Sequence, residues 1–136
     1  MLIEIPQGCL IGWGGLWLPY AARIARREGC ELSELVGEAL SGEARIFVIL
    51  GKDGKPTGAT ATRLLLRNNK TPLGEIHWMA GDGMSDWLGP CLLSLETILQ
   101  RDYGVTAIKA TGRPGWARAA KPHGYRRVKV ILEKAL

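Results

Sequence analysis

The chain has 136 residues, a net charge of +5 and 46% hydrophobic residues, a composition typical of one folded domain spanning residues 1–136. It contains no stretch of about 18 apolar residues, so we expect no membrane span. Three widely spaced cysteines form no Cys-x-x-Cys pair, so we expect neither a metal site nor a disulfide framework, and a cytoplasmic setting is the default.

The first half of the chain predicts two helices followed by antiparallel strands. Apolar residues recur at three- and four-residue intervals from Trp13 to Arg27, which predicts a helix that Gly29 ends. Ser33 is expected to cap a second helix, from Glu34 to Ser41. Three segments rich in β-branched or alternating residues, separated by turn residues, predict a meander of strands: 44–50, 57–66 and 74–80.

The second half predicts alternating helices and strands. Its expected elements are a helix from Ser85 or Asp86 to about Tyr103, a strand Val105–Ala110, a short helix Pro114–Lys121 and a closing strand Tyr125–Lys134. A long helix between two strands favours a parallel crossover. The order ααβββαβαβ therefore predicts an α/β fold with a mixed, mostly antiparallel sheet and helices on both faces.

The third predicted strand, 74–80, carries two groups that can move protons. Strict alternation places Ile76 and Trp78 on one face and Glu75, His77 and Met79 on the other. A carboxylate and an imidazole are common general bases, so Glu75 and His77 are the candidate catalytic pair. The alternative is a solvent-facing Glu-x-His on an amphipathic strand.

Basic residues gather toward the C-terminal end. Between Lys109 and Lys134 eight basic residues accompany one acid, Glu133, whereas residues 71–100 contain no Lys or Arg. A basic C-terminal face of this kind fits an acidic protein or nucleic acid. The alternative is a solvated face, because no nucleic-acid motif accompanies the charge.

Several short motifs, spread along the chain, carry a resemblance to a known superfamily. They are 25–29 (ARREG), 46–48 (IFV), 60–63 (TATR), 81–88 (GDGMSDWL), 112–118 (GRPGWAR), 124–125 (GY) and 132–136 (LEKAL). With these motifs and its element order, the chain resembles the GNAT (acetyltransferase-like) superfamily. Within it, the chain is most similar to small phage- and prophage-encoded GNAT-like proteins. The resemblance covers nearly the whole chain and implies the fold, but it does not by itself give an activity.

The resemblance implies an acyl-CoA site at the start of the long helix. The residues that would bind the cofactor there are Gly81, Gly83, Met84, Ser85 and Asp86. The superfamily's phosphate pattern is incomplete, because the leading Gln or Arg and the spaced glycine pair are missing. Asp82 and Asp86 would repel a pyrophosphate by order 1 kcal/mol each. We therefore expect a self-capped helix start rather than a phosphate cradle.

The resemblance also implies an acid for the departing thiolate. The superfamily's usual tyrosine falls five residues before Tyr125, at Ala120, so this acid is missing, and Tyr125 matches a structural aromatic. Cys91 lies on the apolar stripe of the long helix, so we expect a buried, inert thiol rather than a nucleophile.

Tryptophans and arginines at both ends of the chain are candidates for a partner surface. These residues are Trp13, Trp17, Arg113, Trp116 and Arg118, because exposed aromatics and arginines anchor many interfaces. The alternative is packing, with Trp13 and Trp17 as a lid over the sheet and the arginines paired with Asp82 or Asp86.

Two functions follow from these residues. The first is a phage-encoded, catalytically degenerate GNAT-fold protein without a cofactor, which binds a protein of the phage particle or its assembly. It would act in the host cytoplasm, with packaging in the virion left open. The second is an acyl-CoA-dependent N-acetyltransferase that uses acetyl-CoA, with Glu75 or His77 as base. The missing acid and the acidic loop favour the first. Neither requires a metal or a membrane, and nucleic-acid binding and oligomerisation stay open.

Overall fold

A computed structural model describes residues 1–112, 114–129 and 131–136. Its strands are β1 (Leu2–Glu4), β2 (Ala44–Leu50), β3 (Pro56–Leu66), β4 (Pro72–Gly81) and β5 (Ile108–Ala110). Its α-helices are α1 (Leu18–Glu28), α2 (Leu32–Leu40), α3 (Met84–Tyr103) and α4 (Pro114–Ala120). Short 3-10 turns occupy Gln7–Cys9, Gly14–Leu16 and Lys121–His123.

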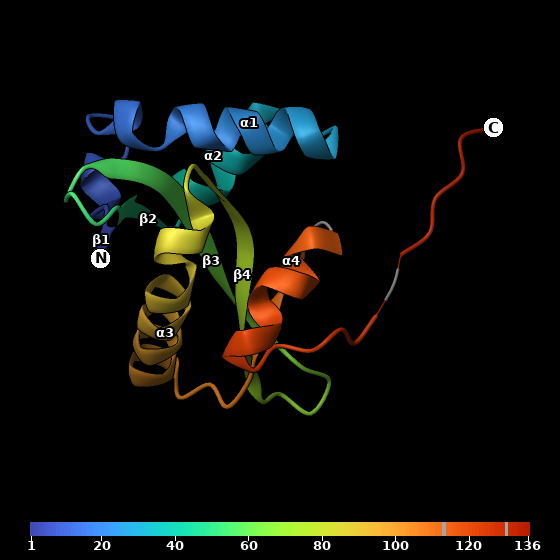
Figure 1. Ribbon diagram of the computed structural model, residues 1–136. Helices are drawn as coiled ribbons and strands as arrows, with labels where there is room; N and C mark the ends of the chain where they lie inside the picture. The colour runs from blue at the N-terminus through green and yellow to red at the C-terminus, as the bar shows by residue number, and fades with distance from the viewer. Residues whose placement is uncertain (113, 130) are drawn as a thin grey trace.

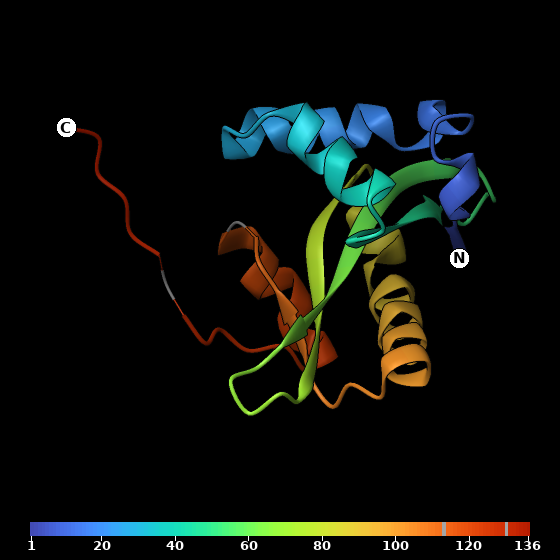
Figure 2. The same ribbon diagram turned by 180° about the vertical axis from the view of Figure 1, so that it is seen from behind.

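The five strands form one sheet in the order β1-β2-β3-β4-β5 (Figure 1). The first four are antiparallel to their neighbours, and β5 is parallel to β4 across the α3 crossover. Helices α1 and α2 cover one face and α3 and α4 the other, as Figures 1 and 2 show from opposite sides. The predicted mixed, mostly antiparallel sheet with helices on both faces is therefore confirmed. In the described part of the chain, no helix is both long and apolar enough to cross a bilayer.

Each face of the sheet buries its own apolar cluster. The cluster under α1 and α2 is built around Trp17, Ile46, Val48 and Trp78. The cluster under α3 and α4 is built around Phe47, Ile49, Ile76, Met79 and the apolar stripe of α3. Because β2 alternates between the two clusters, its β-branched run is buried on both sides.

The N-terminal segment differs from the prediction. Leu2–Glu4 forms the edge strand β1, which the sequence did not indicate. A bidentate ion pair from Arg45 to Glu4 fixes this strand to β2. The first helix begins at Leu18 rather than at Trp13. Trp17 lies before it, 1% exposed, and donates from Nε1 to the carbonyl oxygen of Leu10 at 2.9 Å.

Other predicted boundaries were wrong as well. Helix α2 begins at Leu32 with Glu31 as its N-cap residue and no side-chain cap, so Ser33 lies inside the helix. Strand β5 begins at Ile108 rather than at Val105. The predicted closing strand Tyr125–Lys134 is absent from the described residues of that range, 125–129 and 131–134.

A bulge in β4 changes the face of its last residues. Ala61 of β3 is opposite Trp78, whereas Thr62 is opposite Ile76, so His77 is the extra residue in β4. One extra residue reverses the alternation, and Ile76 and Met79 therefore share the α3 side while Trp78 packs under α1 and α2. The predicted assignment of Trp78 to the face of Ile76, opposite Met79, was wrong for this reason.

Candidate functional site

Strands β4 and β5 pair over a short distance, and β5 ends where the pairing ends. The paired residues are Gly74 with Ile108, Glu75 with Lys109 and Ile76 with Ala110. Strand β4 continues to Gly81, and among the described residues no strand pairs with that edge beyond Ile76. Unpaired strand-edge groups can hydrogen-bond an extended ligand that carries amides. The edge of residues 77–81 is therefore one part of the candidate site.

Helix α3 begins where this edge ends. Gly83 precedes it in the left-handed conformation, with φ 67°, and gives no side-chain cap. Asp86 is in the first turn, but only its backbone N–H is engaged there, donating to the Gly83 carbonyl oxygen at 2.9 Å. The predicted self-capped start was therefore wrong. Backbone N–H groups at an uncapped helix start, together with the helix dipole, attract anions.

Two cations from distant segments meet the acidic residues of this turn. Arg23 Nη1, in α1, lies 3.2 Å from Asp82 Oδ1. Lys52 Nζ, in the β2–β3 turn, lies 3.9 Å from Asp86 Oδ1. All four side chains are well exposed, so these pairs contribute little to stability, but they place positive charge beside the helix start. Among the described residues, the aspartates therefore have Arg23 and Lys52 as counterions and not the predicted Arg118. The other predicted partner, Arg113, lies outside the described residues.

The turn before α3 is held rigidly. The Asp82 carbonyl oxygen accepts hydrogen bonds from Thr57 Oγ1 at 2.9 Å and from Trp87 Nε1 at 2.7 Å. A Cβ atom at Gly81 would lie 2.7 Å from the Thr57 carbonyl oxygen and 2.9 Å from the Trp87 ring. Gly81 is therefore required for packing. Met84 and Ser85 line a pocket of about 370 Å³ between the start of α3 and His123.

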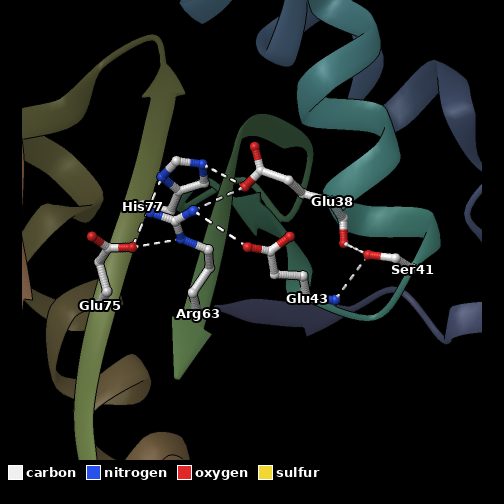
Figure 3. Close-up of polar contacts among 6 residues, drawn as sticks. All are labelled: Glu38, Ser41, Glu43, Arg63, Glu75 and His77. Atoms are coloured by element: carbon white, nitrogen blue, oxygen red, sulfur yellow. Dashed lines mark hydrogen bonds and ion pairs between the residues drawn. The ribbon is translucent and has the colours of Figure 1, made fainter. Parts of the chain in front are cut away.

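A polar cluster lies at the other end of the unpaired β4 edge, on the α2 side of the sheet (Figure 3). Its members are Glu38, Glu43, Arg63, Glu75 and His77. Arg63 is at the centre, with Nε 2.6 Å from Glu75 Oε1 and Nη1 3.2 Å from Glu38 Oε2. Burial lowers the pKa of Arg63, but hydrogen bonding and charge from Glu75 and the other carboxylates outweigh it, so the pKa is raised overall. The guanidinium is thus a fixed positive charge.

His77 lies between two carboxylates of the polar cluster. Its Nε2 is 2.9 Å from Glu38 Oε2 and its Nδ1 is 3.9 Å from Glu75 Oε1. The contact with Glu38 is short but does not have hydrogen-bond geometry, so Nε2 is buried without a hydrogen-bond partner among the described residues. The imidazole therefore lies between two carboxylates, with one of its ring nitrogens without a hydrogen-bond partner among the described residues.

The structure brings Glu75 and His77 together, but not as a solvent-facing pair. The Glu75 side chain is 7% exposed, which contradicts the alternative of a solvated Glu-x-His. The sequence analysis missed Glu38, Glu43 and Arg63. A single charged residue within the otherwise uncharged β3 was the one available signal for Arg63, whereas nothing local indicated that the end of α2 faces His77.

The predicted partner residues do not form one surface. Trp17 is buried, which contradicts its place in an exposed patch. Trp13, 40% exposed, lines an apolar pocket of about 650 Å³ with Ile3 and Val48. Trp116 packs instead against the cluster under α3, and Arg118 is exposed on α4.

No protein-family model matches this chain, and no curated protein matches it. Solved structures do match, each over the whole of this chain. A probable acetyltransferase superposes with a TM-score of 0.70 at 9% identity, covering 96% of that chain. A Trypanosoma brucei acetyltransferase gives 0.66 at 14%, covering 99%. An aminoglycoside acetyltransferase from an uncultured soil metagenomic sample, solved with sisomicin, gives 0.65 at 14%, covering 96%.

These similarities establish the fold. The chain has the GNAT-like acetyltransferase fold, with a five-stranded, mostly antiparallel open sheet. None of these proteins points to a phage or prophage origin, so the virion-associated role stays a prediction.

Proposed function

We propose that this protein is an acyl-CoA-dependent N-acetyltransferase that transfers an acetyl group to an amine. The observation that carries the proposal is the unpaired edge of β4 beyond the end of β5, with a helix start that has no side-chain cap at one end of this edge and the polar cluster at the other. The acetyltransferase fold of the similar structures supports the proposal, although a fold does not by itself determine an activity.

The described residues fit a coenzyme A thioester. The N–H groups of Met84 and Ser85 at the start of α3 would hold its pyrophosphate, with Arg23 and Lys52 offsetting the charges of Asp82 and Asp86. The free edge of residues 77–81 would hydrogen-bond its amide-containing arm. When bound, acetyl-CoA supplies the activated acetyl group.

The polar cluster would bind and deprotonate the acceptor. Three carboxylates face one guanidinium there, so an ammonium group is attracted to it. Glu75 already accepts a bond from Arg63, which leaves His77 as the freer base. Glu38 would balance the charge that His77 gains when it takes the amine proton.

The departing thiolate needs a proton, and the usual tyrosine is missing at Ala120. Tyr125 does not replace it readily, because its hydroxyl is 2.8 Å from Glu96 Oε2 and burial and that contact raise its pKa. We propose that solvent protonates the thiolate.

A coupled assay tests the proposal. The protein is mixed with acetyl-CoA and a panel of primary amines, and released thiol is measured. Wild-type protein should acetylate at least one amine, and His77→Gln should lower kcat by about a hundredfold or more. Failure of the wild type on every amine, or an unchanged rate in His77→Gln, would contradict the proposal.

A further inference from the structure

The polar cluster carries more negative than positive charge. Three carboxylates share the Arg63 guanidinium, at 2.6 Å for Glu75, 3.2 Å for Glu38 and 3.7 Å for Glu43. Within the described part of the chain, no other lysine or arginine lies at ion-pair distance from these carboxylates. With the imidazole of His77 neutral, three negative charges therefore face one positive charge, and two are left without a cation.

Much of this excess charge lies where water has little access. The Glu75 side chain is 7% exposed and the Glu38 side chain is 20% exposed. A carboxylate that leaves water without a matching cation raises the free energy of the folded protein. Packing alone gives no reason for an unbalanced charge at this place, whereas a ligand that brings positive charge would balance it.

Glu43 is the least engaged carboxylate of the cluster. Its side chain is 59% exposed, and its Oε1 lies 3.7 Å from Arg63 Nη1, which is too far for a hydrogen bond. Glu75 and Glu38, by contrast, both accept hydrogen bonds from Arg63. Figure 3 shows Glu43 and Glu75 on opposite sides of the Arg63 guanidinium. Glu43 therefore forms the solvent-exposed end of the cluster and can bind a second cation there.

The backbone at Glu43 is fixed relative to the end of α2. The Glu43 N–H donates to Ser41 Oγ at 3.3 Å, and this hydroxyl donates to the Glu38 carbonyl oxygen at 3.1 Å. Gly42 turns the chain between them in the left-handed conformation, with φ 84°. A cation held by Glu43 would therefore lie in a defined direction from His77, which also contacts Glu38.

We propose that the acceptor amine is a dication, with its reacting amine at His77 and a second ammonium group at Glu43. This inference rests on the proposed acetyltransferase function and names its substrate class, that of diamines and polyamines. Two ammonium groups balance the two excess charges of the cluster, and the balance persists when His77 takes the proton of the reacting amine. An acceptor with a carboxylate in place of the second ammonium group would be repelled by Glu43.

The chemical step is the one already proposed. The amine nitrogen bonds to the acetyl carbon as the carbon–sulfur bond breaks, His77 takes the amine proton, and solvent protonates the thiolate. The second ammonium group keeps its proton and takes no part in bond making. Its contribution is to binding and to the orientation of the reacting amine.

Calorimetric titration without acetyl-CoA tests the second ammonium group directly. The probes are 1,4-diaminobutane, 4-aminobutan-1-ol and 4-aminobutanoate, which share one amine and carry a positive, no and a negative charge at the far end at neutral pH. Wild-type protein should bind the diamine about fivefold or more tightly than the amino alcohol, and the amino acid most weakly. Raising the salt concentration to about 1 M should reduce this preference, because salt screens exposed charges.

Variants at Glu43 locate the second ammonium group. Glu43→Gln should remove most of the preference for the diamine over the amino alcohol, and Glu43→Lys should favour 4-aminobutanoate over the diamine. Each comparison is made between ligands of the same variant, so a general loss of stability would not produce these changes. Glu34→Gln, on the exposed part of α2, is the matched control and should keep the wild-type preference.

The outcomes separate this inference from the proposed function. Equal binding of the diamine and the amino alcohol by wild type, or a preference that survives Glu43→Gln, would overturn the dicationic acceptor. In the coupled assay, acetylation of all three amines without preference for the diamine would overturn it as well, while the acetyltransferase function stands. Glu43-dependent binding of the diamine without any acetylation would support the dication site and contradict the proposed function.

Discussion

Glu38 Oε2 lies 2.9 Å from His77 Nε2, joining the last turn of α2 to the bulge of β4. His77 is the extra residue of the bulge and stays on the face of Glu75, which is the face that α2 covers. The contact therefore links the candidate base of the proposed reaction to the helix that covers this face of the sheet.

Glu38→Gln should lower kcat/KM for acetyl transfer about tenfold, equivalent to about 1.4 kcal/mol. The substitution removes the charge that balances a protonated His77, while the size of the side chain is kept. Steady-state kinetics with a saturating amine measures the effect. Glu34→Gln, one turn earlier on the exposed part of α2, is the control and should leave the rate unchanged. Equal effects of the two changes would exclude a specific role for Glu38.

Arg63→Met should destabilise the fold by about 1–3 kcal/mol, because Glu38, Glu43 and Glu75 lose their shared counterion. The full cost of breaking a buried pair is not expected, since the Arg63 side chain is 23% exposed. Urea unfolding measures the free energy of unfolding. Arg63→Lys should recover part of the loss. A variant as stable as wild type would mean that the cluster contributes nothing to the fold.

Substitution by alanine should have opposite effects on the stability of the fold at Gly81 and at Gly37. Gly81→Ala should destabilise by about 2 kcal/mol or more, because its Cβ would clash with the Thr57 backbone and the Trp87 ring. Gly37→Ala, inside α2 with open space around it, should stabilise by about 0.5–1 kcal/mol. Thermal unfolding compares the two. A neutral Gly81→Ala would show that the turn before α3 relaxes easily.

Cys91 should resist alkylation, since burial raises the pKa of its thiol to about 12. The folded state favours the neutral thiol. Its contribution to stability is therefore complete below the ordinary thiol pKa near 8.5 and is lost as the pH rises toward 12. Iodoacetamide at pH 8 followed by mass spectrometry should label Cys9 before Cys91, and urea should abolish the difference. Rapid labelling of Cys91 in the native protein would contradict its burial.

Periodicity and turn residues were enough to predict the order of the elements from α1 to α4. They did not predict β1, because a strand of three residues shortly before Pro6 has the same sequence pattern as any short apolar segment. The charges near α3 were misjudged because Arg23 and Lys52 are distant in sequence and reach Asp82 and Asp86 only through folding.

Glu75 and His77 were identified from the sequence as the candidate pair because both can act as general bases and both lie in one predicted strand. Their surroundings were not, since Glu38 and Arg63 are distant in sequence and reach this pair only through folding. The closing strand was predicted from residues 125–134, whose pattern is that of a strand, but a strand needs an edge to pair with, and the chain's own β5 does not meet it.

Calorimetric titration with acetyl-CoA tests the central claim most directly. We predict a dissociation constant below about 100 μM, roughly 5.5 kcal/mol. Binding should be weakened in Lys52→Glu but not in Lys55→Glu, the control in the same turn. Absence of binding up to about 1 mM, or equal weakening by the two charge reversals, would contradict a cofactor site at the start of α3.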